Sequence, residues 1–312
     1  MGSITHYDII GDVHGQFDTL VKLLMRLGYR EESQGWSQPG HLAVFVGDLI
    51  DKGPAPGAVL RLVRQMVDAG QALMVVGNHE LNWVRDTYQH QDNPRAFIQA
   101  MRQHHDRQRL VDEFAAEEDG LALLLDHFKW LRTQPLYLEV GKCRVVHAWW
   151  HETSIQHLKA AGIHCLDDHA MAAYQDTYSP TYFAIDRVVA GCEHALRPYA
   201  SATGFRTTRK RVRWWPNDVG LTHPMELEPT LARENGYSTN ANPVFFGHYA
   251  MTGFPMRLGR NIACLDYAAA YGGELVAYRH SPGVALASKW FTSVSVARSS
   301  TTTKTRHAAI AS

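Results

Sequence analysis

Three short clusters in the first quarter of the chain carry side chains that can bind metal ions. They span Gly11–Gly15, Gly47–Pro54 and Gly77–Glu80. Each cluster follows an apolar, β-prone run, so each is expected to end a strand and to deliver a carboxylate, an amide or an imidazole into a loop. Oxygen and nitrogen donors of this kind suit a pair of divalent cations. The clusters therefore predict a hydrolase that uses two metal ions.

Six side chains form the predicted ligand set. Asp48 follows the second strand and is the candidate bridge, because two adjacent cations need a shared carboxylate to screen their repulsion. The full set is Asp12, His14, Asp48, Asn78, His147 and His248, and its last two members follow apolar runs later in the chain. Water shared by two cations exists largely as hydroxide near neutral pH, so a metal-bridging hydroxide is expected to attack phosphorus in line.

Residues beside the ligands are predicted to supply a proton and a positive charge. His79 follows Asn78 and is the candidate general acid for the leaving group. Asp51 is the candidate carboxylate that keeps His79 protonated and oriented. Lys52 is expected to contact a phosphoryl oxygen as a point charge, where an arginine would make two bonds.

The elements around the clusters predict an α/β fold. Apolar residues recur at helical spacing over residues 17–27 and again over 56–69, and a glycine follows each run. β-prone runs at 7–10, 42–46 and 73–76 alternate with these helices. This alternation is typical of a parallel sheet that carries its functional loops at the carboxyl ends of the strands.

The rest of the chain is predicted to hold helical elaborations, an insertion and a second sheet. Residues 31–40 are interpreted as a linker, and residues 81–134 are predicted to be mostly helical. Residues 151–242 show no clear hydrophobic period and are interpreted as an insertion that caps or borders the active site. After a hairpin over 137–146, the runs at 243–246, 261–266, 274–278 and 284–289 are expected to form the second sheet. We predict one domain over 1–290 and a disordered Ser/Thr-rich tail over 291–312.

Together these motifs resemble the phosphoprotein phosphatase branch of the calcineurin-like metallophosphoesterases, and its bacterial members in particular. The family signature GDxHG, GDxxDRG and GNHE, followed by two isolated histidines, is matched from Asp12 to His248. The resemblance implies an αββα sandwich. It also implies that Asp12, His14 and Asp48 hold one metal, and that Asp48, Asn78, His147 and His248 hold the other.

The chain departs from the family pattern at two places. Lys52 stands where the family usually has arginine, and His147-Ala148-Trp149 replaces His-Gly-Gly. A second phosphate-binding arginine is expected from the family, and Arg187 and Arg85 are the candidates, although no motif fixes its position.

Composition excludes other classes of function. The chain has 31 basic residues (Lys and Arg) and 31 acidic residues (Asp and Glu). Its net charge is therefore zero, which gives no reason to expect general nucleic-acid binding. No apolar run reaches the roughly twenty residues of a membrane span, and no signal peptide is visible. We therefore predict a cytoplasmic protein without a membrane partner. The four cysteines form no CxxC pair, which argues against a zinc ribbon or a redox motif.

We predict a phosphatase for phosphomonoesters, with phosphoserine or phosphothreonine in a phosphorylated protein, or a small aryl phosphate, as substrate. Mn²⁺ is the expected metal, with Fe, Zn or Mg as alternatives. An alternative function is the symmetrical hydrolysis of diadenosine tetraphosphate or of another nucleotide, with Trp149, Trp150 and the run Arg209–Trp215 holding a base. For that run, a strand edge with solvated arginines and buried tryptophans is the favoured interpretation. A non-catalytic scaffold that binds a protein partner ranks lowest, because every ligand and acid position is filled.

Overall fold

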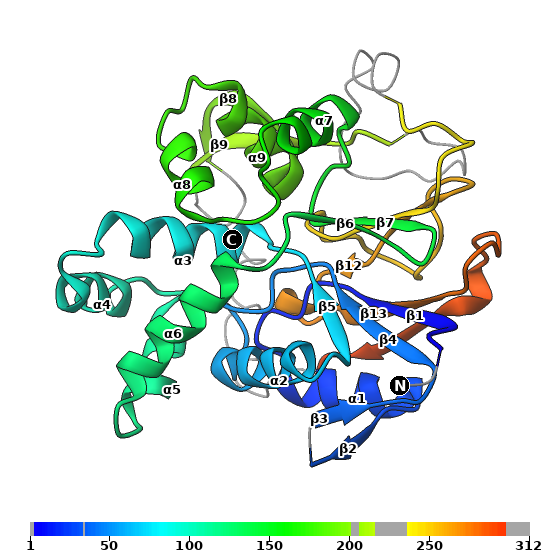
Figure 1. The fold of residues 1–312 in the computed structure, drawn as a ribbon, viewed down its shortest axis with the longest axis horizontal. Helices are drawn as coiled ribbons and strands as arrows, with labels where there is room; N and C mark the ends of the chain where they lie inside the picture. Colours follow the sequence, from blue (N-terminus) through cyan, green and yellow to red (C-terminus); the bar gives the residue numbers. More distant parts are fainter. Residues whose placement is uncertain (1–2, 34, 201–205, 216–235, 298–312) are drawn as a thin grey trace, which may run out of the picture.

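The computed structural model describes residues 3–33, 35–200, 206–215 and 236–297. Two β-sheets lie against each other in the middle of the molecule, with helices on the outer side of the first sheet and the insertion on the outer side of the second (Figure 1). This mixed arrangement confirms the predicted α/β class. In the described residues, no helix is both long and apolar enough to cross a membrane.

The first sheet contains the strands that precede the three N-terminal clusters. β1 (His6–Ile10), β4 (His41–Phe45) and β5 (Ala72–Met74) are parallel neighbours, as predicted. Their last residues are buried, because both faces of the sheet are covered. The sheet continues on the other side of β1 through β13 (Glu274–His280), which also pairs with β12 (Asp266–Tyr267) and β14 (Phe291–Ser295).

The second sheet has the order β11-β10-β7-β6. The predicted hairpin is confirmed as β6 (Tyr137–Val140) and β7 (Cys143–Val146), and β7 runs parallel to β10 (Val244–Phe246), the neighbour of β11 (Ile262–Cys264). The placement of residues 274–278 in this sheet was wrong, because β13 pairs antiparallel with β1 in the first sheet. The expected strand at 284–289 is also absent from this described segment, where Ser288–Trp290 forms a 3₁₀ turn.

Helices α1 (Phe17–Leu27) and α2 (Pro56–Asp68) confirm the two predicted helices and cover the first sheet (Figure 1). α1 buries its leucine face and ends at Gly28, whose φ of 99° is the left-handed conformation that glycine adopts without strain. The predicted linker instead contains a small hairpin of β2 (Arg30–Glu32) and β3 (Gly35–Ser37).

The helical elaboration is confirmed as four helices, α3 (Asn78–Gln89), α4 (Pro94–Arg102), α5 (Gln108–Ala115) and α6 (Gly120–Arg132). Asn93 caps α4, and Asp119 precedes α6 in the left-handed conformation. These helices extend to one side of the sheets (Figure 1). Below they are called the helical layer.

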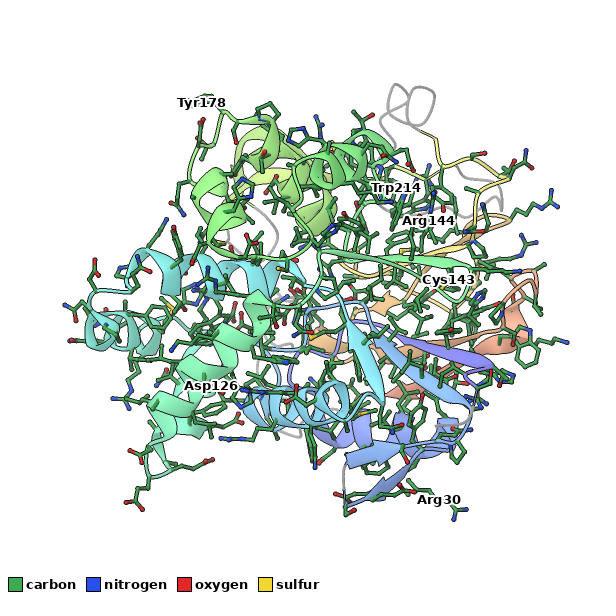
Figure 2. The ribbon with its side chains drawn as sticks, in the orientation of Figure 1. Arg30, Asp126, Cys143, Arg144, Tyr178 and Trp214 are labelled. Carbon is green, nitrogen blue, oxygen red and sulfur yellow. The ribbon has the colours of Figure 1, made fainter. Side chains whose placement is uncertain are left out.

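The predicted insertion contains α7 (Glu152–Ala160), α8 (Asp168–Tyr174) and α9 (Pro180–Ala190), followed by the ribbon of β8 (Cys192–Ala200) and β9 (Arg206–Val212). Trp214, labelled in Figure 2, is fully buried and joins this part to the second sheet by stacking on Trp149 and packing on Phe246. Residues 216–235 lie outside the described part.

The start of the predicted tail was wrong, because Phe291–Ser295 forms β14 and pairs with β13. Residues 298–312, the remainder of the predicted tail, lie outside the described residues. The division into one domain and a tail stays a prediction.

Candidate metal centre

The six predicted ligands come together where strands of both sheets end. Asp48 lies at the centre, since its Oδ2 is 3.5 Å from His14 Nε2 and 3.4 Å from His147 Nε2. Asn78 Oδ1 lies 3.1 Å from His147 Nε2 and 2.8 Å from His248 Nδ1. These contacts join β4 and β5 of the first sheet with β7 and β10 of the second. Asp12 joins the group by accepting a 3.0 Å hydrogen bond from the backbone N–H of His248.

The loops that carry these side chains adopt conformations that cost free energy. His14, Asp48 and His248 have φ values of 45°, 50° and 72°, and Asp51 and Lys52 also lie at positive φ. A non-glycine residue in this region costs roughly 1–3 kcal/mol and persists only where its surroundings hold it there. The concentration of such residues in these loops indicates a functional site.

A buried glutamate holds the loop of Asp48. The Glu80 carboxylate accepts hydrogen bonds of 2.8 Å from the backbone N–H groups of Asp48 and Leu49, and one of 2.9 Å from that of Gly77. Gly77 must be glycine here, because a Cβ atom on it would lie 2.3 Å from Asp48 Oδ1. The fourth residue of the GNHE motif therefore positions the central carboxylate.

Two of the histidines are oriented by backbone carbonyls. His14 Nδ1 lies 3.1 Å from the carbonyl oxygen of Ile50, and His147 Nδ1 lies 2.7 Å from that of Val46. A carbonyl only accepts, so each Nδ1 carries the hydrogen. Their Nε2 atoms are left to face Asp48, which is the arrangement of metal-binding histidines whose other nitrogen donates to a fixed acceptor.

Burial and the charges of neighbouring side chains dominate the electrostatics of the site. Burial raises the pKa of Asp12 well above its usual value, and the carboxylates of Asp266 and Asp48 raise it further. Burial also raises the pKa of Asp48, but the imidazoles of His147 and His79 outweigh this effect and hold it well below its usual value. Burial lowers the pKa of His14 to about 3. A bound cation would favour deprotonated carboxylates and neutral imidazoles throughout the site.

The residues present fit a pair of divalent metal ions. Ligand atoms of Asp12, Asp48 and His147 lie within 4.8 Å of one another, as do those of His14, Asp48 and His79. Asp12 Oδ1 and His248 Nε2 are buried without a hydrogen-bond partner, although such atoms are costly to leave unpaired. Two ions that share Asp48 would satisfy both atoms with hard and borderline donors.

The predicted acid and its carboxylate lie at one side of this cluster. Asp51 Oδ2 is 2.7 Å from His79 Nδ1, while His79 Nε2 points toward Asp48, 4.0 Å from its Oδ2. The other carboxylate oxygen of Asp51 accepts a 2.8 Å hydrogen bond from the indole N–H of Trp83. The sequence analysis missed Trp83. It lies four residues after His79, so the helical spacing that places both on one face of α3 could have indicated it.

The open side of the cluster carries two positively charged side chains and an exposed aromatic ring. Lys52 and Arg211 line the same small pocket as Asp12, Asp48 and His248, together with Tyr271. Arg211 reaches the pocket from β9 and donates to the carbonyl oxygen of His248. Lys52 Nζ lies 5.1 Å from the centre of the Tyr271 ring, and Tyr271 is 73% exposed. The sequence analysis named Lys52 as a substrate contact. It included Arg211 only as part of the run Arg209–Trp215 that the nucleotide alternative assigned to substrate binding, and it did not name Tyr271.

The two arginines proposed from the sequence are placed elsewhere. Arg187 is exposed on α9, and Arg85 on α3 pairs with Asp86 at 2.9 Å. Among the described residues, neither lines the pocket that contains Lys52 and Arg211. No sequence motif marks Arg211, because its place depends on how β9 folds back onto a loop 37 residues later.

The tryptophans considered as a base-binding wall are buried. Trp149, Trp150, Trp214 and Trp215 are at most 3% exposed, and Trp214 donates from its indole N–H to the Ala148 carbonyl oxygen at 2.9 Å. They therefore hold the loop of His147 against the second sheet. In the run Arg209–Trp215, the structure confirms the favoured interpretation for the tryptophans, but Arg211 lines the metal-ligand pocket.

Comparisons with known proteins agree with this fold. A model of the family described as calcineurin-like phosphoesterase matches residues 6–195. The chain therefore belongs to the calcineurin-like phosphoesterases. It is a metal-dependent phosphoric ester hydrolase, which confirms the predicted enzyme class.

Two relatives extend the comparison. The chain is 27% identical over 279 residues to a symmetrical bis(5'-nucleosyl)-tetraphosphatase of Aromatoleum aromaticum, a match that covers 86% of this chain and 92% of that protein. It is 49% identical over 74 residues to an asymmetrical bis(5'-nucleosyl)-tetraphosphatase of Halalkalibacterium halodurans. That second match covers 23% of this chain and spans only 30% of the relative's length.

A solved structure of a cold-active protein-tyrosine phosphatase from a Shewanella species is similar with a TM-score of 0.53. The match covers 95% of this chain and 81% of the other at 20% identity, so it shows a shared fold alone.

These findings correct the substrate predicted from the sequence. The relatives matched over most of the chain are named symmetrical bis(5'-nucleosyl)-tetraphosphatases. The prediction of a phosphoserine or phosphothreonine phosphatase was therefore wrong, and the nucleotide alternative is favoured. The error arose because the signature motifs carry the metal chemistry, whereas the substrate is selected by residues outside them.

Proposed function

We propose that this protein hydrolyses dinucleoside polyphosphates and cleaves diadenosine tetraphosphate symmetrically. The observation that carries the proposal is the grouping of Lys52, Arg211 and Tyr271 around the cluster of metal ligands. A polyphosphate chain presents several adjacent negative charges, which two side-chain cations beside the metals can neutralise. An exposed ring at the same mouth offers a face on which a base can stack. The symmetrical tetraphosphatases among the relatives give independent support.

The metal pair is assigned to the six ligands gathered at the strand ends. Asp12, His14 and Asp48 would hold one ion, and Asp48, Asn78, His147 and His248 would hold the other. When bound, two such ions polarise phosphoryl oxygens and lower the pKa of a coordinated water. We propose Mn²⁺ as the native ion, because mixed carboxylate, amide and imidazole ligands suit it.

The side chains of the protein then have three tasks. Lys52 and Arg211 bind the non-bridging oxygens of the phosphate chain and place its central bond over the ligand cluster. His79 donates a proton to the departing phosphate oxygen, and Asp51 orients its imidazole through the 2.7 Å contact at Nδ1. Water adds to one of the two central phosphorus atoms, the bond from this phosphorus to the central bridging oxygen breaks, and two molecules of ADP result.

The experiment is product analysis with protein stripped of metal and reloaded with Mn²⁺. Diadenosine tetraphosphate is incubated with the enzyme and the nucleotides are separated by anion exchange, with p-nitrophenyl phosphate and a phosphothreonine peptide assayed alongside. We expect ADP as the only initial product, with a larger kcat/KM than for either monoester. Formation of ATP and AMP in equal amounts would show that the cleavage is asymmetrical and would contradict the proposed symmetrical cleavage. Absence of nucleotide release, with turnover of a monoester, would remove the proposed substrate.

A further inference from the structure

The two carboxylate oxygens of Asp51 have different partners. Oδ2 contacts His79 Nδ1 at 2.7 Å, and Oδ1 accepts from the indole N–H of Trp83 at 2.8 Å. Both Asp51 and Trp83 are buried, with exposed fractions of 2% and 0%. Within the described part of the chain, the Asp51 carboxylate therefore has two hydrogen-bond partners, the imidazole of His79 and the indole of Trp83.

The indole of Trp83 is itself held by the helical layer. Its ring stacks on Phe128 of α6, with centroids 4.8 Å apart and planes inclined by 22°, and meets the edge of Phe97 of α4 at 5.9 Å. Arg107, which precedes α5, places its guanidinium carbon 5.1 Å from the ring centre and is itself tied to Asp86. Contacts from α4, α6 and the residue before α5 therefore fix the direction of the indole N–H.

The same layer holds the loop that carries Asp51. Arg109 of α5 donates to the carbonyl oxygen of Gly53 at 3.2 Å, and Glu113 accepts from the backbone N–H of Gly57 at 2.9 Å. Asp51 and Lys52, directly before Gly53, have φ values of 66° and 61°, a conformation that needs such support. The helical layer thus contacts the side chain of Asp51 and the backbone of the residues that follow it.

We propose that Trp83 is a positioning residue for proton transfer, which acts through Asp51 to set the orientation of His79. This inference rests on the proposed function, because it assumes that His79 protonates the leaving group. A carboxylate can rotate about its terminal bond, and a fixed donor on Oδ1 selects the orientation in which Oδ2 faces Nδ1 of the imidazole. The Nε2 proton of His79 is then directed to one place, which general acid catalysis requires.

The dependence of rate on the leaving group separates this role from a structural one. Aryl esters of ADP carry the aryl group on the terminal phosphate, and their hydrolysis gives ADP and a phenol, so the same phosphorus is attacked while the acidity of the phenol varies. A general acid helps a basic leaving group such as unsubstituted phenol, with a pKa of about 10, far more than a nitrophenol. Phenyl and p-nitrophenyl phosphate serve as a parallel monoester pair.

Four enzymes are compared: wild type, His79→Asn, Trp83→Phe and Phe128→Leu. Trp83→Phe removes the N–H and keeps an aromatic ring, whereas Phe128→Leu loosens the packing of the indole and keeps its donor. We expect His79→Asn to slow phenol release by about 10²-fold or more, and Trp83→Phe to slow it by about tenfold on the same argument. Both should change nitrophenol release much less. Phe128→Leu should affect both leaving groups equally, and metal content should stay that of wild type in all four.

Equal losses on both leaving groups in Trp83→Phe, as in Phe128→Leu, would overturn the proposal and leave Trp83 a packing residue. If His79→Asn slowed the release of phenol and nitrophenol by the same factor, the acid role of His79 would be wrong, and so would the role of Trp83. If only the proposed substrate is wrong, wild type will fail to hydrolyse the dinucleotide. The phenyl and p-nitrophenyl phosphate pair will still measure the leaving-group effect in that case. If Trp83→Phe does not fold, replacing Trp83 with benzothienylalanine exchanges the indole N–H for sulfur in a ring of the same shape and gives the same comparison.

Discussion

Arg211 connects the predicted insertion to the pocket of the candidate metal ligands. It comes from the β8–β9 ribbon and lines the pocket beside Lys52, with its guanidinium bonded to the carbonyl oxygen of His248. Lysine offers a compact point charge, whereas arginine can bind two phosphate oxygens in one plane. The pair can therefore bind a phosphate chain in a fixed orientation, with Arg211 supplying the directional contact.

A charge-removing substitution tests this assignment against the sequence-based one. In Arg211→Ala we expect kcat/KM for diadenosine tetraphosphate to fall about 10- to 100-fold, since a hydrogen bond to a charged group contributes roughly 1.5–3 kcal/mol. Arg211→Lys should recover part of the loss, because the charge returns without the planar donor pair. Steady-state kinetics on both variants give the measurement.

Arg187→Ala is the matched control. Arg187 is exposed on α9, and among the described residues it does not line the pocket, so its removal should change kcat/KM less than twofold by the usual effect of a surface substitution. A large loss in Arg187→Ala with normal kinetics in Arg211→Ala would restore the original candidate.

At this scale the sequence predicts ligands better than substrate contacts. Asp12, Asp48, Asn78 and His79 lie in short motifs, because each follows the end of a strand by two to five residues. Arg211 and Tyr271 reach the same pocket from distant segments without any local requirement. Only the tertiary fold places them beside the candidate metal ligands.

At the scale of elements, α2 and α6 pack through a network of charged groups. Arg64 of α2 bonds to Asp126 of α6 at 2.6 Å, and its Nη1 lies 3.4 Å from Nδ1 of the buried His127 (Asp126 is labelled in Figure 2). Asp68 and Arg61 of α2 face the same place, and Phe114 of α5 covers the imidazole edge-on. Burial, together with the charges of Arg64 and Arg61, lowers the pKa of His127 to about 4.

This shift predicts a pH dependence of stability. The unfolded chain binds a proton at His127 below a pKa of about 6.5, whereas the folded chain does so only near 4. Between these values the unfolded state holds more protons, so the free energy of unfolding decreases as pH falls through this window. We expect this residue to account for about 1–3 kcal/mol of the loss.

Urea unfolding of wild type and His127→Gln at pH 7 and pH 4 measures how much of the acid-induced loss of stability comes from His127. The variant should lose less stability on acidification than wild type. His105→Gln is the control, because that side chain is fully exposed and its loss should leave the pH profile unchanged. Parallel profiles for wild type and His127→Gln would contradict the prediction.

The elements also show where local pattern stops being informative. The leucine spacing of α1 and its closing glycine specify that helix without reference to the rest of the chain. β13 is equally apolar, but its partner β1 lies some 270 residues earlier in the chain, with Tyr7 opposite His280. The alternation of a strand specifies its buried face and not its neighbour, so β13 was assigned to the wrong sheet.

At the scale of the whole molecule, the candidate metal site lies between the two sheets. Asp12, Asp48 and Asn78 follow strands of the first sheet, and His147 and His248 follow strands of the second. Asp12, Asp48 and both histidines are buried at this junction, where like charges repel and two atoms lack partners. Bound cations would join the sheets and remove the repulsion, so catalysis and stability are expected to share this site.

Metal removal should therefore lower the melting temperature. A ligand at 100 times its Kd stabilises the folded state by about 2.7 kcal/mol, and for a chain of this size each kcal/mol corresponds to roughly 2 °C. We expect chelation to lower Tm by about 5 °C and added Mn²⁺ to restore it, with metal content measured by mass spectrometry. Asp48→Asn should bind less metal and lose most of this response, because it removes the shared carboxylate, whereas Asp68→Asn on the surface of α2 should behave as wild type. An unchanged Tm after verified metal loss would mean that protein contacts alone hold the two sheets together.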